Sequence, residues 1–422
     1  MNKFKQYILI AITLLSNVSC DKFNEADEAE ETAPLEVSIT VDIDVPNMAS
    51  SEGLVVKVVN NAEGYSYKKE FTGEHVSVKD VIPGIYTISV SGTAKDTSGA
   101  EYYINGNSVN QALYDDIVNV KINLQGLKVS PLVFKEIYYC GSRPPVGFSY
   151  FRDQFYEIYN NSNEVQYLDG VYMAHLYPTN ATRELPVWPE ADANKYCYGE
   201  RVWKFHGTGK DYPLQPGESA VVAQFAANHK LEIYNPNSPV DCSHAEFEFN
   251  MNNANFPDQP AIDMVHVYNN GKAEMGSAPQ YLTPVFGSAY AIFRVPADEK
   301  WDPVNDMSLQ ADDLSTSEEE HKARIPIKYI LDAVEAVNDD SYTDAKRIPA
   351  VLDAGVTTVG AIYCSLAVAR KVSLTDDGEI MRRSNGAIIF QDTNNSTEDF
   401  ERGVVPEPHR YGTGVPFWNA TY

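Results

Sequence analysis

The strict alternation of apolar and polar residues from Leu35 to Val45 constrains the fold of this chain more than any other feature. Positions 35, 37, 39, 41, 43 and 45 are all Leu, Val or Ile, whereas Glu, Ser, Thr and Asp occupy the positions between them. A period of two residues is that of a β-strand, in which successive side chains point to opposite faces. We therefore expect a half-buried strand here, with one face on a core and the other in water.

Further strands are expected up to residue 126. A looser apolar alternation continues over residues 54–59, 65–71, 76–81 and 118–124. Pro83-Gly84 marks a turn, and Asn105-Gly106 predicts a hairpin. Strands of this length and spacing predict a small β-sandwich over residues 35–126. The segment from Val81 to Ile88 resembles a strand of transthyretin-like and immunoglobulin-like modules in secreted bacterial proteins, which implies a scaffold rather than an activity.

Length and composition are those of a globular protein with more than one domain. The chain has 422 residues, of which 43% are hydrophobic and 22% are charged. Two to three domains of ordinary size fit this length. The formal net charge is −26, with 33 Lys and Arg against 59 Asp and Glu. Such an acidic surface repels phosphates, so we expect no nucleic-acid partner.

Residues 1–19 have the pattern of an export signal. Lys3 and Lys5 precede an apolar run, Tyr7 to Leu15, which is shorter than the ~20 residues needed to span a bilayer. Small residues then lead to Cys20. This order resembles a bacterial lipobox, which implies that cleavage leaves Cys20 as a lipid-bearing N-terminus. The alternative is an ordinary cleaved signal peptide in which the cysteine is incidental.

Residues 20–34 form an acidic tether that should be disordered through self-repulsion. An acidic stretch directly behind a lipidated cysteine resembles the surface-export signal of Bacteroidetes lipoproteins. The resemblance implies an outer-membrane protein that is anchored by its lipid and faces the cell exterior. The alternative is a plain spacer that faces the periplasm.

The other four cysteines are spread along the chain, at Cys140, Cys197, Cys242 and Cys364. An exported protein meets oxidising conditions, so one or two disulfides can form. Four cysteines allow three pairings, and the sequence does not choose among these or four free buried thiols. No CxxC occurs, which argues against a thiolate zinc site.

A more specific resemblance begins at Leu132. Its motifs, in chain order, lie at residues 132–138, 154–162, 168–170, 214–222 and 365–400. They resemble the "EI" strand, the "F-x-E-ϕ-Y-N-x-S" strand, the "L-x-G" turn, the "L-x-P-G-E" turn and the closing segment of the lamin-tail domain. That resemblance implies an elaborated immunoglobulin-like β-sandwich over residues 131–412, with insertions near 175–210 and 268–350. The whole chain resembles a Bacteroidetes lipoprotein family of unknown function.

The second insertion carries a helical pattern. Ile327, Ile330, Leu331, Val334 and Val337 are spaced three, one, three and three residues apart, and Pro326 suits a first helical turn. This spacing predicts a short helix that packs on the core. The overall fold class is therefore mostly β, with two tandem β-sandwiches and one helix-containing insertion.

Three carboxylates are candidates for acid–base chemistry. Glu136, Glu157 and Asp169 lie within the lamin-tail motifs. Their structural interpretation, as acceptors of hydrogen bonds, is favoured because no histidine or metal motif accompanies them. The enzymatic alternative is a hydrolase that needs two carboxyls about 5–9 Å apart in a pocket.

Two segments carry ligand types for a metal. Asp392, Asn394, Ser396 and Asp399 alternate as oxygen ligands do in calcium loops, although the Gly and Glu of an EF-hand are missing. The favoured interpretation is an Asx-turn cluster, with a structural calcium as the alternative and no other cofactor expected. A second segment contains His229, Asp241, Cys242 and His244, in a spacing that matches no standard zinc pattern.

Aromatic residues are the remaining candidates for a ligand-binding surface. Tyr150 and Phe151 follow a Gly/Pro-rich loop, and Trp188 and Trp203 lie in or near the first insertion. Exposed aromatic clusters contact glycans and proteins, although aromatics on strands more often belong to the core.

Standard enzymatic motifs are missing from the sequence, including GxSxG, HExxH, Walker A and GxGxxG. We therefore expect a non-enzymatic surface lipoprotein that binds a nutrient or a protein partner and acts as an accessory to a TonB-dependent transporter. Two alternatives are an extracellular hydrolase with a carboxylate pair and an envelope adhesin or scaffold.

Overall fold

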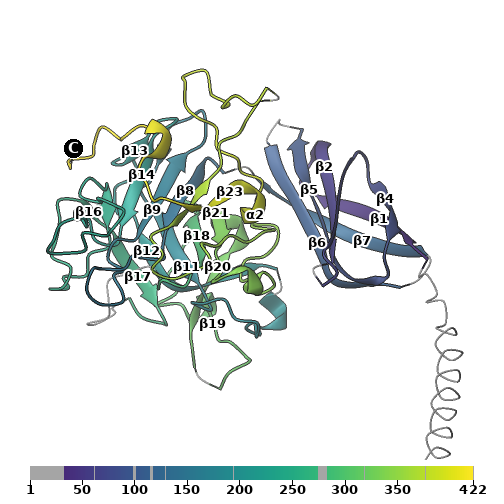
Figure 1. The fold of residues 1–422 in the computed structure, drawn as a ribbon, viewed down its shortest axis with the longest axis horizontal. Helices are drawn as coiled ribbons and strands as arrows, with labels where there is room; N and C mark the ends of the chain where they lie inside the picture. The colour runs from purple at the N-terminus through teal and green to yellow at the C-terminus, as the bar shows by residue number, and fades with distance from the viewer. Residues whose placement is uncertain are drawn as a thin grey trace, which may run out of the picture.

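The computed structural model describes residues 33–421, apart from residues 61, 98–100, 115–116, 129, 193, 274–282, 318 and 376. The signal peptide, Cys20 and almost all of the acidic tether lie outside the described residues. Within the described part of the chain, no helix combines the length and the apolar character needed to cross a bilayer. The chain is mostly β, as the sequence predicts, and forms an N-terminal and a C-terminal domain that lie side by side (Figure 1).

The N-terminal domain is one hydrogen-bonded sheet with the strand order β3-β2-β5-β6-β7-β1-β4. The strands are β1 (Leu35–Asp44), β2 (Met48–Asn60), β3 (Tyr65–Phe71), β4 (His75–Val81), β5 (Gly84–Asp96), β6 (Glu101–Leu113) and β7 (Ile117–Lys128). The expected half-buried strand is confirmed as β1, where Val37 and Ile39 are fully buried and Glu36 and Asp42 are exposed.

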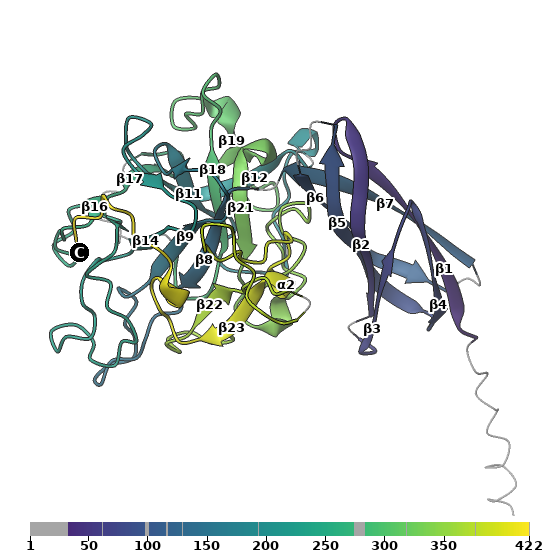
Figure 2. The same ribbon diagram turned by 90° about the horizontal axis from the view of Figure 1, so that it is seen from above.

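This sheet folds over on itself, so that its two halves enclose one core (Figures 1 and 2). One half supplies Val56 from β2 and Ile88 from β5, and the other supplies Ile39 from β1, Val78 from β4 and Ile122 from β7. Two facing layers with alternating buried positions form a β-sandwich.

The hairpin predicted at Asn105-Gly106 does not form, because both residues lie inside strand β6. A Cβ on Gly106 would lie only 2.3 Å from the carbonyl oxygen of Asn123 on β7. The glycine therefore serves the close approach of two strands instead of a turn, a use that the dipeptide alone does not reveal.

The C-terminal domain contains two larger sheets and a short ladder between β10 (Gln166–Tyr167) and β13 (Pro213–Leu214). The first sheet has the order β16 (Ile262–Asp263), β15 (Phe247–Glu248), β14 (Ser219–Ala223), β9 (Phe155–Asn160), β8 (Leu132–Tyr138), β22 (Ala367–Arg370) and β23 (Phe400–Val404). The second has the order β19 (Gln310–Ala311), β20 (Lys322–Pro326), β12 (Tyr196–Lys204), β11 (Val171–Leu176), β18 (Ala289–Arg294) and β21 (Ile330–Glu335), with β17 (Val265–Asn269) also paired to β12.

The core of this domain takes side chains from both sheets. Phe134 and Tyr156 enter it from the first sheet, and Met173, Trp203 and Ile292 enter it from the second. Every residue of β8, β9 and β11 is buried, so these strands are covered on both faces and lack polar alternation.

Segments 175–210 and 268–350, which the lamin-tail resemblance assigns to insertions, supply strands of the second sheet. Strand β12 lies in the first segment, and β18, β20 and β21 lie in the second. The lamin-tail classification stays a prediction.

The helix predicted around Ile327–Val337 is wrong. Residues Ile327–Tyr329 form a single 3-10 turn, η3, and Ile330–Glu335 form strand β21, which pairs antiparallel with β18. Nearly all of β21 is buried, so its apolar residues occur at both strand and helix spacings. The spacing of apolar residues therefore does not distinguish a strand from a helix here.

Candidate functional site

The four aromatic residues that the sequence singles out do not meet in one place. Trp203 is 0% exposed in the core between the sheets, with its ring 4.7 Å from that of Phe249, so its selection as a ligand contact is corrected. Tyr150 is largely buried, and its hydroxyl lies 2.7 Å from Nδ1 of His229. Phe151 is half-buried against a small cluster that contains Phe225. Trp188 lines an open cleft.

This cleft has a volume of about 340 Å³, and aromatic residues form part of its lining. The aromatic residues that line it are Tyr177, Trp188, Tyr196 and Tyr198. The rings of Trp188 and Tyr198 stack with centroids 3.5 Å apart and planes 8° from parallel. The ring of Tyr177 meets Trp188 edge-on at 6.0 Å. Trp188 remains half-exposed, so part of its ring is open to a ligand.

The loop that carries Trp188 is tied to a distant segment. The backbone N–H of Val187 donates to Oδ1 of Asp313 at 2.9 Å, and the N–H of Leu314 donates to the carbonyl oxygen of Val187 at 2.7 Å. These two hydrogen bonds connect the loop to residues that lie more than 100 positions further along the sequence. Loops of this kind, held by a rigid scaffold, commonly carry binding residues.

Polar groups complete the cleft. Asp192, at the end of the 3-10 helix η1 (Glu190–Asp192), accepts from Nε of Arg324 at 2.6 Å and from the hydroxyl of Tyr198 at 3.3 Å. Glu190 and Asn194 line the same cleft and are exposed. The cleft therefore combines flat aromatic rings with carboxylate and amide groups, and Lys346 and Arg347 also line it.

A buried ionic cluster supports the position of Tyr177. Nζ of Lys322 lies 4.2 Å from the centre of the Tyr177 ring, which is a cation–π distance. The same ammonium lies 3.8 Å from Glu200, whose carboxylate is also 3.3 Å from Nε2 of His175. Burial by itself would raise the pKa of Glu200, but the hydrogen bond and charge of His175 and the charge of Lys322 lower it to about 2.

We expect Glu200→Gln to be less stable than the wild type at pH 7, by up to about 3 kcal/mol. The pKa of Glu200 is lowered in the folded state, so its contribution is complete above the usual value near 4.5. The contribution is lost as the pH falls toward about 2, and the two proteins should converge there. Urea unfolding between pH 7 and pH 3.5 measures this difference, with Glu190→Gln at the exposed rim as control. A difference that grows in acid would contradict the assignment.

The three candidate catalytic carboxylates each have structural partners. Glu136 and Glu157 are neighbours across β8 and β9. Glu136 is paired with Arg410 at 2.8 Å, and Glu157 is paired with Lys135 at 2.8 Å. Asp169 accepts from three backbone N–H groups of the loop at residues 209–212, each at 2.9 Å. These contacts support the structural interpretation of all three.

The candidate calcium ligands of the 392–399 loop also form ion pairs and hydrogen bonds with other residues of the protein. Asp392 and Asp399 lie 3.1 and 3.7 Å from the guanidinium of Arg370, which supplies a positive charge. The backbone N–H of Ser396 donates to Asp353 at 2.8 Å, and the N–H of Thr393 donates to Asp399 at 2.9 Å. The loop is thus held by Arg370 and Asp353 from outside it and by Asp399 from within, and these contacts favour the structural interpretation of its oxygen ligands.

The histidines near Cys242 do not converge as metal ligands. His229 is fully buried and bonded to Tyr150 and to the carbonyl oxygen of Phe225, whereas Nδ1 of His244 bonds the carbonyl oxygen of Thr421. Among the described residues, one group of three carboxylates could hold a cation, formed by Glu248, Asp258 and Asp263. Burial raises the pKa of Glu248 to about 7. The irregular spacing of these residues matches no metal motif, and the pairing of β15 with β16 brings Glu248 and Asp263 together.

The structure also brings two of the four cysteines together. Sγ of Cys140 lies 3.3 Å from Sγ of Cys364, and both are free thiols, as are the buried Cys197 and Cys242. The sequence leaves three disulfide pairings open. The fold brings two sulfur atoms into contact for the pairing that contains Cys140–Cys364.

Comparison with known proteins identifies close relatives of unknown function. Residues 215–407 match the family model described as "Protein of unknown function (DUF4876)". The crystal structure of a DUF4876 family protein from Bacteroides thetaiotaomicron shares 60% sequence identity with this chain. The match covers 92% of this chain and 100% of that one, with a TM-score of 0.70.

A second solved structure is far more distant. A "putative cell adhesion protein" from Bacteroides eggerthii matches at 8% identity over 62% of this chain and 74% of its own, with a TM-score of 0.17. A similarity this low does not define a shared fold. No curated protein matches the chain. Because the relative from Bacteroides thetaiotaomicron is 60% identical and is matched over its whole length, the chain belongs to the DUF4876 family.

Proposed function

We propose that this protein binds a neutral saccharide in the aromatic cleft around Trp188. The observation that carries the proposal is the stacked pair of Trp188 and Tyr198 beside the carboxylate of Asp192. The C–H face of a sugar ring packs against an aromatic plane, and sugar hydroxyls donate to carboxylates. A volume of about 340 Å³ suits one or two sugar units.

The charge of the chain agrees with a neutral ligand. A formal net charge of −26 repels polyanions but has no comparable effect on an uncharged sugar. The structural partners of Glu136, Glu157 and Asp169 also support binding over hydrolysis, because each carboxylate is already held by a cation or by backbone N–H groups.

The export signal supplies the proposed location. A lipid on Cys20 and the acidic residues behind it would place the protein on the outer membrane, facing the cell exterior. A saccharide-binding lipoprotein there would capture a nutrient and pass it to a partner, such as a TonB-dependent transporter. Mild cross-linking of intact cells, followed by mass spectrometry, tests for such a transporter.

Trp188→Ala should weaken saccharide binding by about tenfold or more, because it removes the aromatic platform of the cleft. The measurement is a screen of the full chain on an array of neutral glycans, followed by calorimetry with the best ligand. Phe148→Ala is the matched control, since Phe148 is 92% exposed and lies outside the cleft.

The proposal fails if the wild type binds no neutral glycan on the array, or if Trp188→Ala binds the selected glycan as tightly as the wild type. Thermal melting of both variants shows whether any lost affinity reflects unfolding instead.

A further inference from the structure

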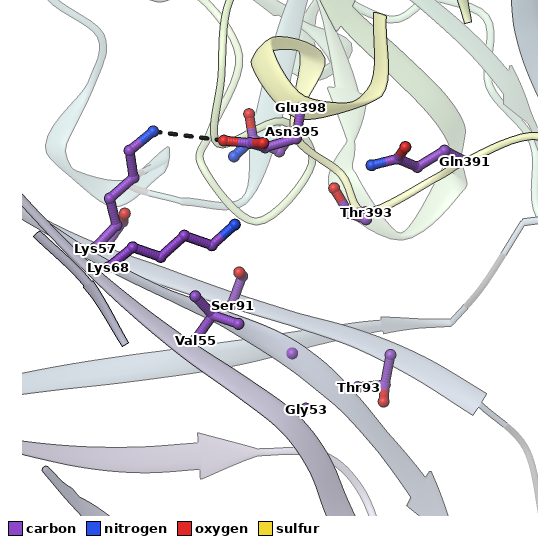
Figure 3. Close-up of a pocket in the computed structure, with 12 residues that line it drawn as sticks. Gly53, Val55, Lys57, Lys68, Ser91, Thr93, Gln391, Thr393, Asn395 and Glu398 are labelled. Carbon is purple, nitrogen blue, oxygen red and sulfur yellow. Dashed lines mark hydrogen bonds and ion pairs between the residues drawn. The ribbon is translucent and has the colours of Figure 1, made fainter. Parts of the chain in front are cut away.

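A second cavity lies where the two domains meet. It has a volume of about 260 Å³ and is lined by β2, β3 and β5 of the N-terminal domain and by residues 391–398 of the C-terminal domain. Figure 3 shows Lys57 and Lys68 extending from the N-terminal sheet toward this loop. Ligand sites occur preferentially at such domain junctions.

The charges that line this groove are unlike those of the molecule as a whole. Lys57 and Lys68 are directly opposite each other on β2 and β3, and Glu398 is the one acidic residue in the lining. Lys57 lies 3.5 Å from Glu398, with both side chains more than one-third exposed, so this ion pair is weak and open to exchange. Two cations against one carboxylate leave a single positive charge, in a chain of net charge −26.

Hydroxyl and amide groups, together with Val55 and two glycines, form the rest of the lining. Ser91 and Thr93 project from β5, and Gln391 and Thr393 lie across the groove from them on the loop (Figure 3). Ser89 of β5 also lines the groove. This lining suits a ligand that carries several hydroxyls in addition to a charge.

A buried amide lies beside the groove. Asn105 is opposite Ser91 in the β5–β6 pair, is 2% exposed, and donates from Nδ2 to the carbonyl oxygen of Thr393 at 3.4 Å. Its Oδ1 has no hydrogen-bond partner among the described residues. Asn105 is not part of the groove lining, so this buried acceptor is a cost of the domain junction and is not counted as a ligand contact.

We propose that this groove binds a monocarboxylated sugar of one unit. The carboxylate would lie between Lys57 and Lys68, and the ring hydroxyls would bond to the serine, threonine and amide side chains. A single excess positive charge matches a monoanion better than a phosphate monoester, which carries about −1.5 to −2 charge at pH 7 and would also be repelled more strongly by the acidic molecule. This site is separate from the cleft around Trp188 and shares no lining residue with it.

The test is calorimetric titration of the full chain with glucuronate, glucose and inorganic phosphate at low salt. We expect glucuronate to bind at least about tenfold more tightly than glucose, because charge-assisted hydrogen bonds are the stronger ones. The double variant Lys57→Gln/Lys68→Gln should lose this preference. Lys69→Gln is the matched control, because Lys69 is the neighbour of Lys68 but contacts the carbonyl oxygen of Ser77 instead of lining the groove.

Equal binding of glucuronate and glucose, or an unchanged double variant, would overturn the proposal. Tighter binding of phosphate than of glucuronate would also overturn it, by showing a general anion site. Trp188→Ala should bind glucuronate as the wild type does, so failure of the neutral-saccharide proposal and failure of this one are distinguishable.

Discussion

Replacing Arg370 by methionine should lower the free energy of unfolding by about 3–5 kcal/mol at pH 7, because it leaves buried carboxylates without their cation. Arg370 on β22 is 2% exposed. Its guanidinium lies 2.6 Å from Asp332 on β21, 3.1 Å from Asp392 and 3.7 Å from Asp399. The side chain thus joins the two sheets of the C-terminal domain and the loop that precedes β23.

The loss should depend on pH in a defined direction. Burial raises the pKa of Asp332, and Arg370 is the main group that opposes this rise. Without Arg370, the folded-state pKa values of Asp332 and Asp399 rise further above their unfolded values near 4. A raised folded-state pKa contributes stability at low pH that is lost as the pH rises, so the deficit should be largest at pH 7 and should shrink toward pH 4.

Urea unfolding followed by tryptophan fluorescence measures this effect within one domain. All four tryptophans, Trp188, Trp203, Trp301 and Trp418, belong to the C-terminal domain. Arg382→Met is the control, because Arg382 is exposed and should change stability by less than about 0.5 kcal/mol. A deficit of Arg370→Met that is the same at pH 7 and pH 4.5 would contradict the electrostatic explanation.

The second large effect is expected from Trp203→Ala, which should cost about 3–5 kcal/mol of stability. Trp203 lies on β12, between β11 and β17, and its ring packs on Phe249 at 4.7 Å and on His266 at 4.9 Å. Removing this fully buried indole opens a cavity in the core shared by both sheets.

The same urea experiment distinguishes the roles of Trp188 and Trp203, which are selected together from the sequence as candidate binding residues. The three tryptophans left in Trp203→Ala still report unfolding of the domain. Trp188→Ala should lose much less stability, because its side chain is half-exposed, and should lose saccharide binding instead. If Trp203→Ala were as stable as the wild type, the indole would not have the core role that the structure assigns to it.

The fold class could be predicted from the sequence because it depends on local spacing. The alternation from Leu35 to Val45 specifies the buried and exposed faces of β1, and these are the faces observed. Local spacing fails where a segment is buried on all sides. Residues 330–335 form a strand because β18 lies beside them, and their apolar residues do not distinguish this from a helix.

The candidate site was only partly predictable. Trp188 belongs to the set of aromatics that the sequence selects, but Trp203 belongs to the same set and is buried. Their different roles depend on Val187 bonding to Asp313 and on β12 lying inside a sheet, which are contacts between distant parts of the chain.

The sequence by itself determined the β character of this protein, the half-buried first strand and the aromatic residues from which a binding surface could be built. Only the tertiary structure decided which aromatic ring is open to a ligand and which carboxylates form ion pairs with Arg370, Arg410 and Lys135. It also decided where two lysines face a loop that lies more than 300 residues away in the sequence. The physical reason is that periodicity records the environment of neighbours along the chain, whereas burial, ion pairing and cavities depend on residues that only folding brings together.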